Sequence, residues 1–179
     1  MAFYDEYFKS IYENLNSVES SLLDAAVDLL KDTSAVGGKV IFFGNGGSAA
    51  MASHVAVDLT KNAGIRSINF NESDLITCFA NDYGYEEWMK MSIEFYADPK
   101  DLVVLISSSG ASQNVINAGK HAKERELKVI TFSGFKADNP LRALGDLNFW
   151  VDNGEYNIVE MTHHVLLLAI VDRIIASRS

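Results

Sequence analysis

Hydrophobic positions in the first thirty residues recur at intervals of three and four. They fall at Tyr4, Phe8, Ile11, Leu15, Val18, Leu22, Ala26 and Leu29. This spacing predicts one amphipathic helix over residues 4–29 with a narrow apolar face. Because this helix precedes every predicted strand, we expect it to pack on a partner helix or a second subunit rather than to cover a small sheet.

The pattern changes after Gly37 and Gly38 to short apolar runs separated by helical stretches. Strands are predicted at residues 39–43, 66–70, 102–107, 128–133 and 147–151, and helices at 48–61, 73–97, 112–125 and 156–176. Such alternation is typical of a parallel sheet whose right-handed crossovers place helices on both faces. We therefore expect a three-layer α/β sandwich and one domain over 1–179, with an N-terminal oligomerisation helix (1–35) and an α/β core (36–179).

Composition narrows the partners and the compartment. Fifteen basic and 24 acidic side chains give a net charge of −9, which opposes nonspecific attraction to nucleic acid and to anionic lipid. The longest apolar run, residues 165–171, is too short to span a bilayer, and the N-terminus lacks the pattern of a secretory signal. The single cysteine, Cys78, cannot form an internal disulfide, so we expect it to pack in a protein of the reducing cytoplasm.

A glycine-rich loop, GNGGS at residues 44–48, joins the first predicted strand to a helix. Its glycines allow a sharp turn and a close approach of the backbone to a ligand, and Ser48 is placed to cap the helix. The spacing matches neither the dinucleotide fingerprint nor the phosphate loop that carries a lysine. Alone, the loop fits a plain strand-to-helix turn as well as it fits an anion site.

A serine-rich loop, SSSGASQN at residues 107–114, follows the third predicted strand. Its four hydroxyls exceed what a helix cap at Ser112 requires, and hydroxyls together with amides can surround an anion. In a doubly wound sheet, the loops that follow the strands lie on the ligand-binding edge. The two loops together favour a phosphate site that needs no lysine or arginine.

Three segments together resemble the sugar isomerase (SIS) domain family, in its phosphoheptose isomerase branch. They are GNGGS with the following His54 and Asp58, ITCFANDYGYE at 76–86, and SSSGASQNVINA at 107–118. The resemblance extends over almost the whole chain. It implies a flavodoxin-like fold, a homotetramer with active sites between subunits, and interconversion of sedoheptulose 7-phosphate with an aldoheptose 7-phosphate.

The resemblance also implies a set of residues that bind the substrate. Ser107, Ser109 and Ser112 match the family's phosphate-binding serines, and Asn45 and Ser48 match its glycine-loop contacts. The expected substrate- and phosphate-binding residues are Asn45, Gly46, Gly47, Ser48, Asn81, Asp82, Ser107, Ser108, Ser109, Ser112 and Asn114. Without the resemblance, the segment containing Asn81 and Asp82 reads as a helix break at a glycine.

Interconversion of a ketose and an aldose through an enediol needs a base, and an acid or a metal for the oxygens. The family places a His and a Glu four residues apart on the helix after GNGGS, and here these positions hold His54 and Asp58. Residues four apart share a helical face, although Asp is one methylene shorter than Glu. We expect Asp58 to move the proton, with His54 as a ligand or an orienting group.

The last predicted helix departs from the family pattern. The family has Gln-Glu-x-His and a further His eight residues after the Gln, and this Gln and this His complete a zinc site in metal-bearing members. Aligned on the Glu, this chain has Val159, Glu160, Thr162 and Leu167. His164 lies one turn before Leu167 and is the expected substitute acid.

Two further interpretations concern the histidines. His54, Asp58 and His164 together offer the nitrogen and oxygen donors of a catalytic zinc site. The alternative is that His163 and His164 form a hydrogen-bonded pair in a subunit interface. His121, among lysines and glutamates, is expected to be solvated.

The leading hypothesis for function is a sugar-phosphate isomerase. It would convert D-sedoheptulose 7-phosphate to D-glycero-D-manno-heptose 7-phosphate and so supply heptose for surface polysaccharide. The altered last helix favours an alternative, a non-catalytic sugar-phosphate-binding or regulatory protein. A third hypothesis is isomerisation or epimerisation of a different phosphosugar.

Overall fold

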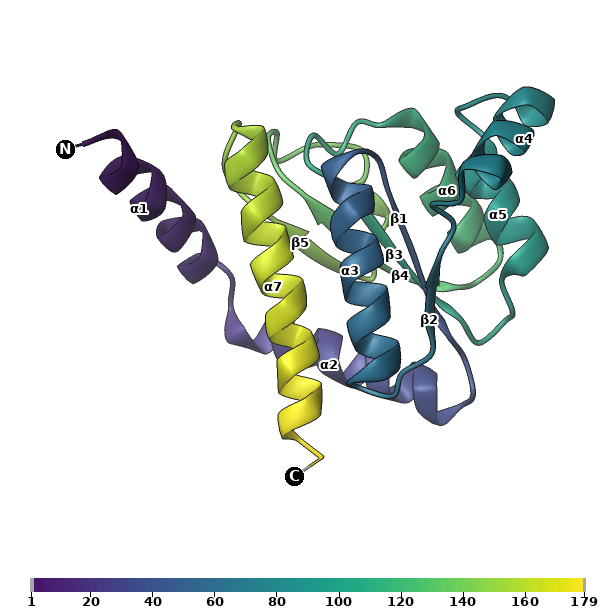
Figure 1. Cartoon of the computed structure of the whole chain (residues 1–179), viewed down its shortest axis with the longest axis horizontal. Coiled ribbons are helices and arrows are strands. Elements are labelled where there is room, and N and C mark those ends of the chain that lie inside the picture. The colour runs from purple at the N-terminus through teal and green to yellow at the C-terminus, as the bar shows by residue number, and fades with distance from the viewer. Residues whose placement is uncertain (1, 179) are drawn as a thin grey trace.

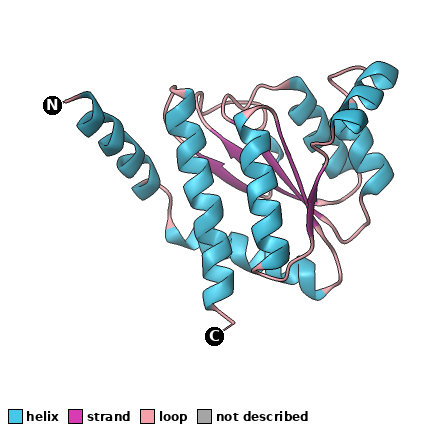
Figure 2. Cartoon of the chain, in the orientation of Figure 1, coloured by secondary structure: helices cyan, strands magenta, loops and turns pink. Residues whose placement is uncertain are grey.

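The computed structural model describes residues 2–178 and contains one five-stranded sheet (Figures 1 and 2). Its strands are β1 (Val40–Gly44), β2 (Ser67–Asn69), β3 (Leu102–Ser107), β4 (Lys128–Ser133) and β5 (Leu147–Trp150). They are all parallel, in the order β2-β1-β3-β4-β5. This order is the flavodoxin-like one, which confirms the predicted fold class.

Seven α-helices surround the sheet. They are α1 (Phe3–Asn16), α2 (Ser20–Ala35), α3 (Gly47–Lys61), α4 (Ser73–Tyr83), α5 (Trp88–Tyr96), α6 (Gln113–Glu124) and α7 (Tyr156–Ala176). A short 3₁₀ turn, Arg142–Leu144, precedes β5. In Figure 1, α3 and α7 run side by side across one face of the sheet, and α1 projects beyond α7.

Alternate side chains of the central strands build two apolar cores. Val40 and Phe42 of β1 face the core that α2, α3 and α7 cover. Ile41 and Phe43 point to the opposite face, where α5 and α6 cover them. The period of two along each strand therefore produces the three layers that the sequence predicts. Within residues 2–178, no helix has both the length and the apolar character needed to cross a membrane.

The predicted helix over residues 4–29 is in fact two helices, so the N-terminal 35 residues are not one continuous element. The chain leaves the helix at Ser17 and restarts after Glu19, whose backbone is extended. The side chains of Asn14, Asn16 and Ser17 hydrogen-bond to backbone carbonyls three or four residues back. Such local bonds compete with helix propagation and explain the break.

The predicted helix over residues 73–97 is also divided. Gly84 has φ +93°, a conformation that favours glycine, and it ends α4 before α5 begins at Trp88. Trp88 and Met89 are buried in the second core. Cys78 on α4 is exposed, so the expectation that it packs in the interior is wrong.

Candidate functional site

The candidate site lies where the order of the strands reverses. The chain passes from β1 to the neighbouring β2 on one side, then returns to place β3 on the other side of β1. The loops that follow β1 and β3 therefore diverge from adjacent strand ends, one into α3 and the other into α6. In open α/β sheets this switch point is where ligands bind.

The glycine loop turns at Gly46, which has φ +53° and is the N-cap residue of α3. No side chain caps this helix, and the amides of Ser48 and Ala49 donate to the Asn45 carbonyl oxygen, so the Gly47 amide is the one left for an anion in the first turn. Ser48 is buried in the first helical turn and is not the cap. The expected role of Ser48 as a cap is therefore wrong, whereas its place beside the expected ligand is consistent with the structure.

The serine loop turns at Gly110, which has φ +63° and packs so tightly on Asn139 that a Cβ would collide with it. Ser112 is the N-cap residue of α6, but its hydroxyl makes no capping bond. It instead accepts a hydrogen bond of 3.1 Å from Ser107 Oγ. The Val115 amide donates to Asn114 Oδ1, so the amides of Gln113 and Asn114 and the Ser112 hydroxyl are the donors left at the start of α6.

Two asparagines join the loops. Asn45 Nδ2 donates to Asn114 Oδ1, and Asn114 Nδ2 donates to Asn45 Oδ1, both at 2.9 Å. Tyr85 Oη also donates to Asn45 Oδ1, at 3.1 Å. Asn114 is buried, so this pair fixes the separation of the two loops from within the protein.

A polar pocket of about 120 Å³ opens between the loops. Its lining residues are Asn45, Ser48, Ile106, Ser107, Ser108, Ser109, Ser112, Tyr156 and Glu160. No lysine or arginine is among them. An anion in this pocket would meet hydroxyls and the start of α3 and α6, which are the donors that phosphate accepts from.

The other expected binding residues lie around this pocket rather than in its lining. Gly46 and Gly47 form the turn and the first residue of α3, and Asn114 supports Asn45. Asn81 and Asp82 are exposed on α4, where Asn81 Nδ2 donates to Asp82 Oδ1 at 2.9 Å. The structure does not bring these two residues into the pocket lining.

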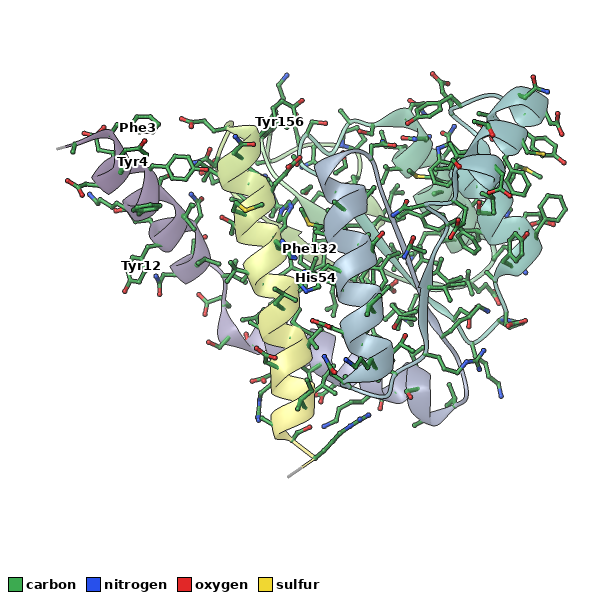
Figure 3. All side chains as sticks on the ribbon, in the orientation of Figure 1. Phe3, Tyr4, Tyr12, His54, Phe132 and Tyr156 are labelled. Carbon is green, nitrogen blue, oxygen red and sulfur yellow. The ribbon has the colours of Figure 1, made fainter. Side chains whose placement is uncertain are left out.

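A second group of polar side chains lies where α3 runs beside α7, and His54 of this group is labelled in Figure 3. His54 Nδ1 lies 3.0 Å from His164 Nε2, and His54 Nε2 lies 3.4 Å from Asp58 Oδ2. Asn62 Nδ2 donates to the other oxygen of Asp58 at 3.1 Å. The contacts therefore connect His164 to His54, His54 to Asp58, and Asp58 to Asn62.

This arrangement does not fit the zinc site considered above. His164 and Asp58 contact different nitrogens of the His54 ring, and those nitrogens point in different directions. Three donors must converge on one point to bind a catalytic metal. Within the described part of the chain, no group of three or more His, Cys, Asp or Glu side chains is placed to hold a metal ion.

The two neighbouring histidines of α7 differ in environment. Burial lowers the pKa of His164, and the nearby His54 lowers it further. Burial lowers the pKa of His163 to about 4, against an opposing effect of its hydrogen bond with the Ser133 carbonyl oxygen. His163 is fully enclosed in the protein, so only His164 is open to a ligand.

The structure also shows which face of α7 meets the pocket. Val159 and Leu167, the residues aligned with the family's Gln and final His, are both buried in the subunit core. Glu160 faces the pocket instead, with Oε1 3.4 Å from Ser108 Oγ. Sequence reasoning assigned no site role to Glu160, Tyr156 or Tyr85, although the motif around Tyr85 was noted.

His121 lies far from this group on the opposite face of the sheet. Its side chain is 14% exposed and its ring nitrogens contact Glu94 at 2.9 Å and Glu124 at 3.3 Å. The expectation that His121 is simply solvated is therefore wrong. These contacts join α5 to α6 and have no part in the pocket.

The chain folds as a doubly wound parallel sheet, and its polar pocket lies at the switch point of the strand order. These two features define an α/β protein with a ligand-binding site of the kind that suits an anion. Comparison with known proteins identifies its family. Residues 3–134, more than half of the chain, match the model of the SIS domain. The chain belongs to the SIS domain family.

Similar proteins include several phosphoheptose isomerases. The chain is 31% identical over 175 residues to the one from Thermodesulfovibrio yellowstonii, covering 90% of this chain and 87% of the relative. It is 32% identical over 170 residues to the one from Syntrophotalea carbinolica, covering 90% and 86%. The solved phosphoheptose isomerase GmhA from Neisseria gonorrhoeae superposes with a TM-score of 0.88 at 28% identity, covering 97% and 96%.

Proposed function

We infer that this chain is a sugar-phosphate isomerase that interconverts D-sedoheptulose 7-phosphate and D-glycero-D-manno-heptose 7-phosphate. The observation that carries the inference is that α3 joins two features: its first turn borders the polar pocket, and His54 and Asp58 lie further along the same helix. The similar proteins named phosphoheptose isomerase support the same reaction.

The distance along α3 suits a seven-carbon substrate. Ser48 and His54 are six residues apart, which is about 9 Å along the axis at 1.5 Å per residue. An extended chain advances about 1.2 Å per bond, so the eight bonds from the phosphorus to C1 of a heptulose 7-phosphate span about 10 Å. With its phosphate between the loops, the sugar would therefore place C1 and C2 beside His54, one helical turn before Asp58.

The proton transfers are assigned to Asp58 and His164. Asp58 removes a proton from C1 of the ketose and returns it to C2 of the enediol. The unprotonated Nδ1 of His164 accepts the proton of O1 and then gives it to O2, a role suited to an imidazole whose lowered pKa favours the neutral form. Because the donors do not converge, no step is assigned to zinc.

His54 connects the base to the acid. With neutral rings, both contacts are satisfied when His54 Nε2–H points to Asp58 and His164 Nε2–H donates to His54 Nδ1. In this assignment the Asp58 carboxylate accepts the hydrogen bond of the His54 ring. Asn62 Nδ2–H fixes the second carboxylate oxygen and so orients Asp58.

Assembly and location are part of the proposal. Phe3, Tyr4, Phe8 and Tyr12 on α1 are each more than 60% exposed, an apolar surface that suits burial against other copies of the chain. We propose a homotetramer with active sites between subunits. The exposed free thiol of Cys78 suits a reducing cytoplasm, where the product would serve surface polysaccharide synthesis.

A second candidate is a sugar-phosphate-binding protein without catalysis. The apolar Val159 and Leu167, where the family pattern has Gln and His, favour it. The two candidates separate when the purified protein is incubated with sedoheptulose 7-phosphate and followed by NMR. An isomerase forms aldoheptose 7-phosphate, whereas the binding protein perturbs the substrate signals and forms no product.

A further inference from the structure

Glu160 brings a carboxylate into the anion pocket. Its Oε1 lies 3.4 Å from Ser108 Oγ, and its carboxylate fits so closely against Gly47 that a Cβ there would collide with Oε2. The side chain therefore lies at the N-terminal end of α3, between the two loops proposed to hold the phosphate. A bound phosphate and Glu160 would be close neighbours.

The pocket offers no positive charge to separate these two anions. Its lining contains hydroxyls, one amide side chain and the tyrosine Tyr156, and neither lysine nor arginine. The ionisable groups further along the two helices are His164, one turn further on α7, and His54 on α3. Burial and the nearby His54 lower the pKa of His164, which favours the neutral form of this ring.

Two anions held side by side without a cation share a proton, as paired carboxylates do. We propose that Glu160 couples phosphate binding at this pocket to the uptake of one proton, which is shared between its carboxylate and a phosphate oxygen in the complex. The proton comes from solvent when the ligand arrives as a dianion and with the ligand when it arrives as a monoanion, and the protonated partner donates it as an O–H hydrogen bond. This inference rests on the phosphate site of the proposed function.

The coupling makes Glu160 a specificity-determining residue. A phosphate monoester has a second pKa of about 6 and can bring the proton itself. Sulfate has the same shape and charge but is not protonated near neutral pH, so it binds only when Glu160 takes up the proton. The pocket should therefore prefer phosphate to sulfate, and the preference should depend on the Glu160 carboxylate.

Isothermal titration calorimetry with sodium sulfate and with inorganic phosphate tests this inference. The proteins are the wild type, Glu160→Gln, and the matched control Glu155→Gln. Glu155 is the exposed residue before α7 and lies outside the pocket lining, so its substitution changes the net charge equally. Titrations at pH 6 and pH 8, each in two buffers of different ionisation enthalpy, count the protons taken up.

The wild type and Glu155→Gln should take up about one proton per sulfate, and their sulfate affinity should fall about tenfold for each pH unit above neutrality. Glu160→Gln should take up none and bind sulfate at pH 8 at least about tenfold more tightly than the wild type. Its preference for phosphate over sulfate should shrink accordingly.

Weaker sulfate binding by Glu160→Gln, or no proton uptake by the wild type, would overturn the inference. Absence of any sulfate or phosphate binding to all three proteins would overturn it together with the phosphate site. Failure of isomerase activity with proton-coupled binding intact would refute the proposed reaction alone.

Discussion

Hydroxyls rather than basic side chains are available to hold an anion at the proposed phosphate pocket. Ser107 and Ser109 stand at either side of Ser108, and Ser107 is buried. A hydrogen bond to a charged group contributes about 1.5 to 3 kcal/mol, so the double variant Ser107→Ala with Ser109→Ala should lose at least about 3 kcal/mol of binding, or over a hundredfold in affinity. Calorimetry with sedoheptulose 7-phosphate measures this loss. An unchanged affinity would place the phosphate elsewhere.

Asp58 and His164 carry the proposed proton transfers. A general base contributes about 10²- to 10⁴-fold in rate, so Asp58→Asn should lower turnover by at least about 10²-fold while affinity for the substrate stays nearly the same. His164→Ala should also lower turnover. His121→Ala, on the other face of the sheet, serves as the control and should retain activity. Full activity of Asp58→Asn would show that the base is another group.

The sequence predicted the two loops of the pocket, but it did not predict the part of the pocket that α7 contributes. The serines and glycines lie in loops whose place is fixed by the strand ends, so their grouping follows from the fold alone. Glu160 was given no site role because its contact with Ser108 joins residues 52 apart and has no local signal in the sequence. The mutual hydrogen bonds of Asn45 and Asn114 join residues 69 apart and have no local signal.

The helix α1 is one of two α-helices in the described part of the chain without a buried residue, the other being α4. None of its residues is buried, and Figure 3 shows Phe3, Tyr4 and Tyr12 along the projecting helix. By contrast, α2 contributes Ala26, Val27 and Leu30 to the first core. The N-terminal region therefore combines an exposed apolar helix with a second helix that the subunit itself needs.

This division changes how assembly is best tested. Removing all residues before Ser34 would expose the first core and should cause aggregation. Phe8→Glu with Tyr12→Glu alters only the exposed face of α1 and should convert the proposed tetramer to smaller, folded species, because charged groups resist burial in an interface. Multi-angle light scattering measures the mass, with Lys9→Glu as the control. A monomeric wild type at micromolar concentration would contradict the proposed assembly.

The ends of helices and strands were predicted where the spacing of apolar residues changes. They were missed where the same spacing continues across a break in the helix. The spacing of threes and fours runs through Ser17 because Leu15, Val18 and Leu22 all pack against the first core, although the helix breaks between them. The signal for this break was local, in side chains that bond to the backbone. Gly84 carried a clearer signal, and the chain does break there.

For the whole molecule, the buried His163 links stability to pH. Its pKa is about 4 in the folded protein and about 6.5 when exposed. The neutral ring therefore contributes stability in full above pH 6.5, and that contribution is lost as the pH falls towards 4. Between pH 7.5 and pH 5 the free energy of unfolding should decrease by about 2 kcal/mol through this residue.

Urea denaturation of the wild type and of His163→Gln at the two pH values measures this contribution. Gln keeps a donor for the Ser133 carbonyl but does not titrate. The decrease in unfolding free energy on acidification should be smaller in His163→Gln by about 2 kcal/mol. Equal decreases in the two proteins would mean that His163 accepts a proton without cost in the folded state.

The fold as a whole was predictable because the alternation of strands and helices leaves few topologies for a parallel sheet. The resemblance then selected the flavodoxin-like order. The sequence did not predict the directions in which side chains of α3 and α7 point toward each other. Those directions decide whether His54, Asp58 and His164 converge on a metal or line up for proton transfer.

The central claim is that this lined-up group moves a proton between C1 and C2 of a heptulose phosphate. The most direct test is NMR of the wild type with sedoheptulose 7-phosphate in D₂O. His54 is 49% exposed, so protons on the group should exchange with solvent. The account predicts aldoheptose 7-phosphate that carries deuterium at C2. Absence of the aldose, or an aldose without deuterium at that carbon, would contradict it.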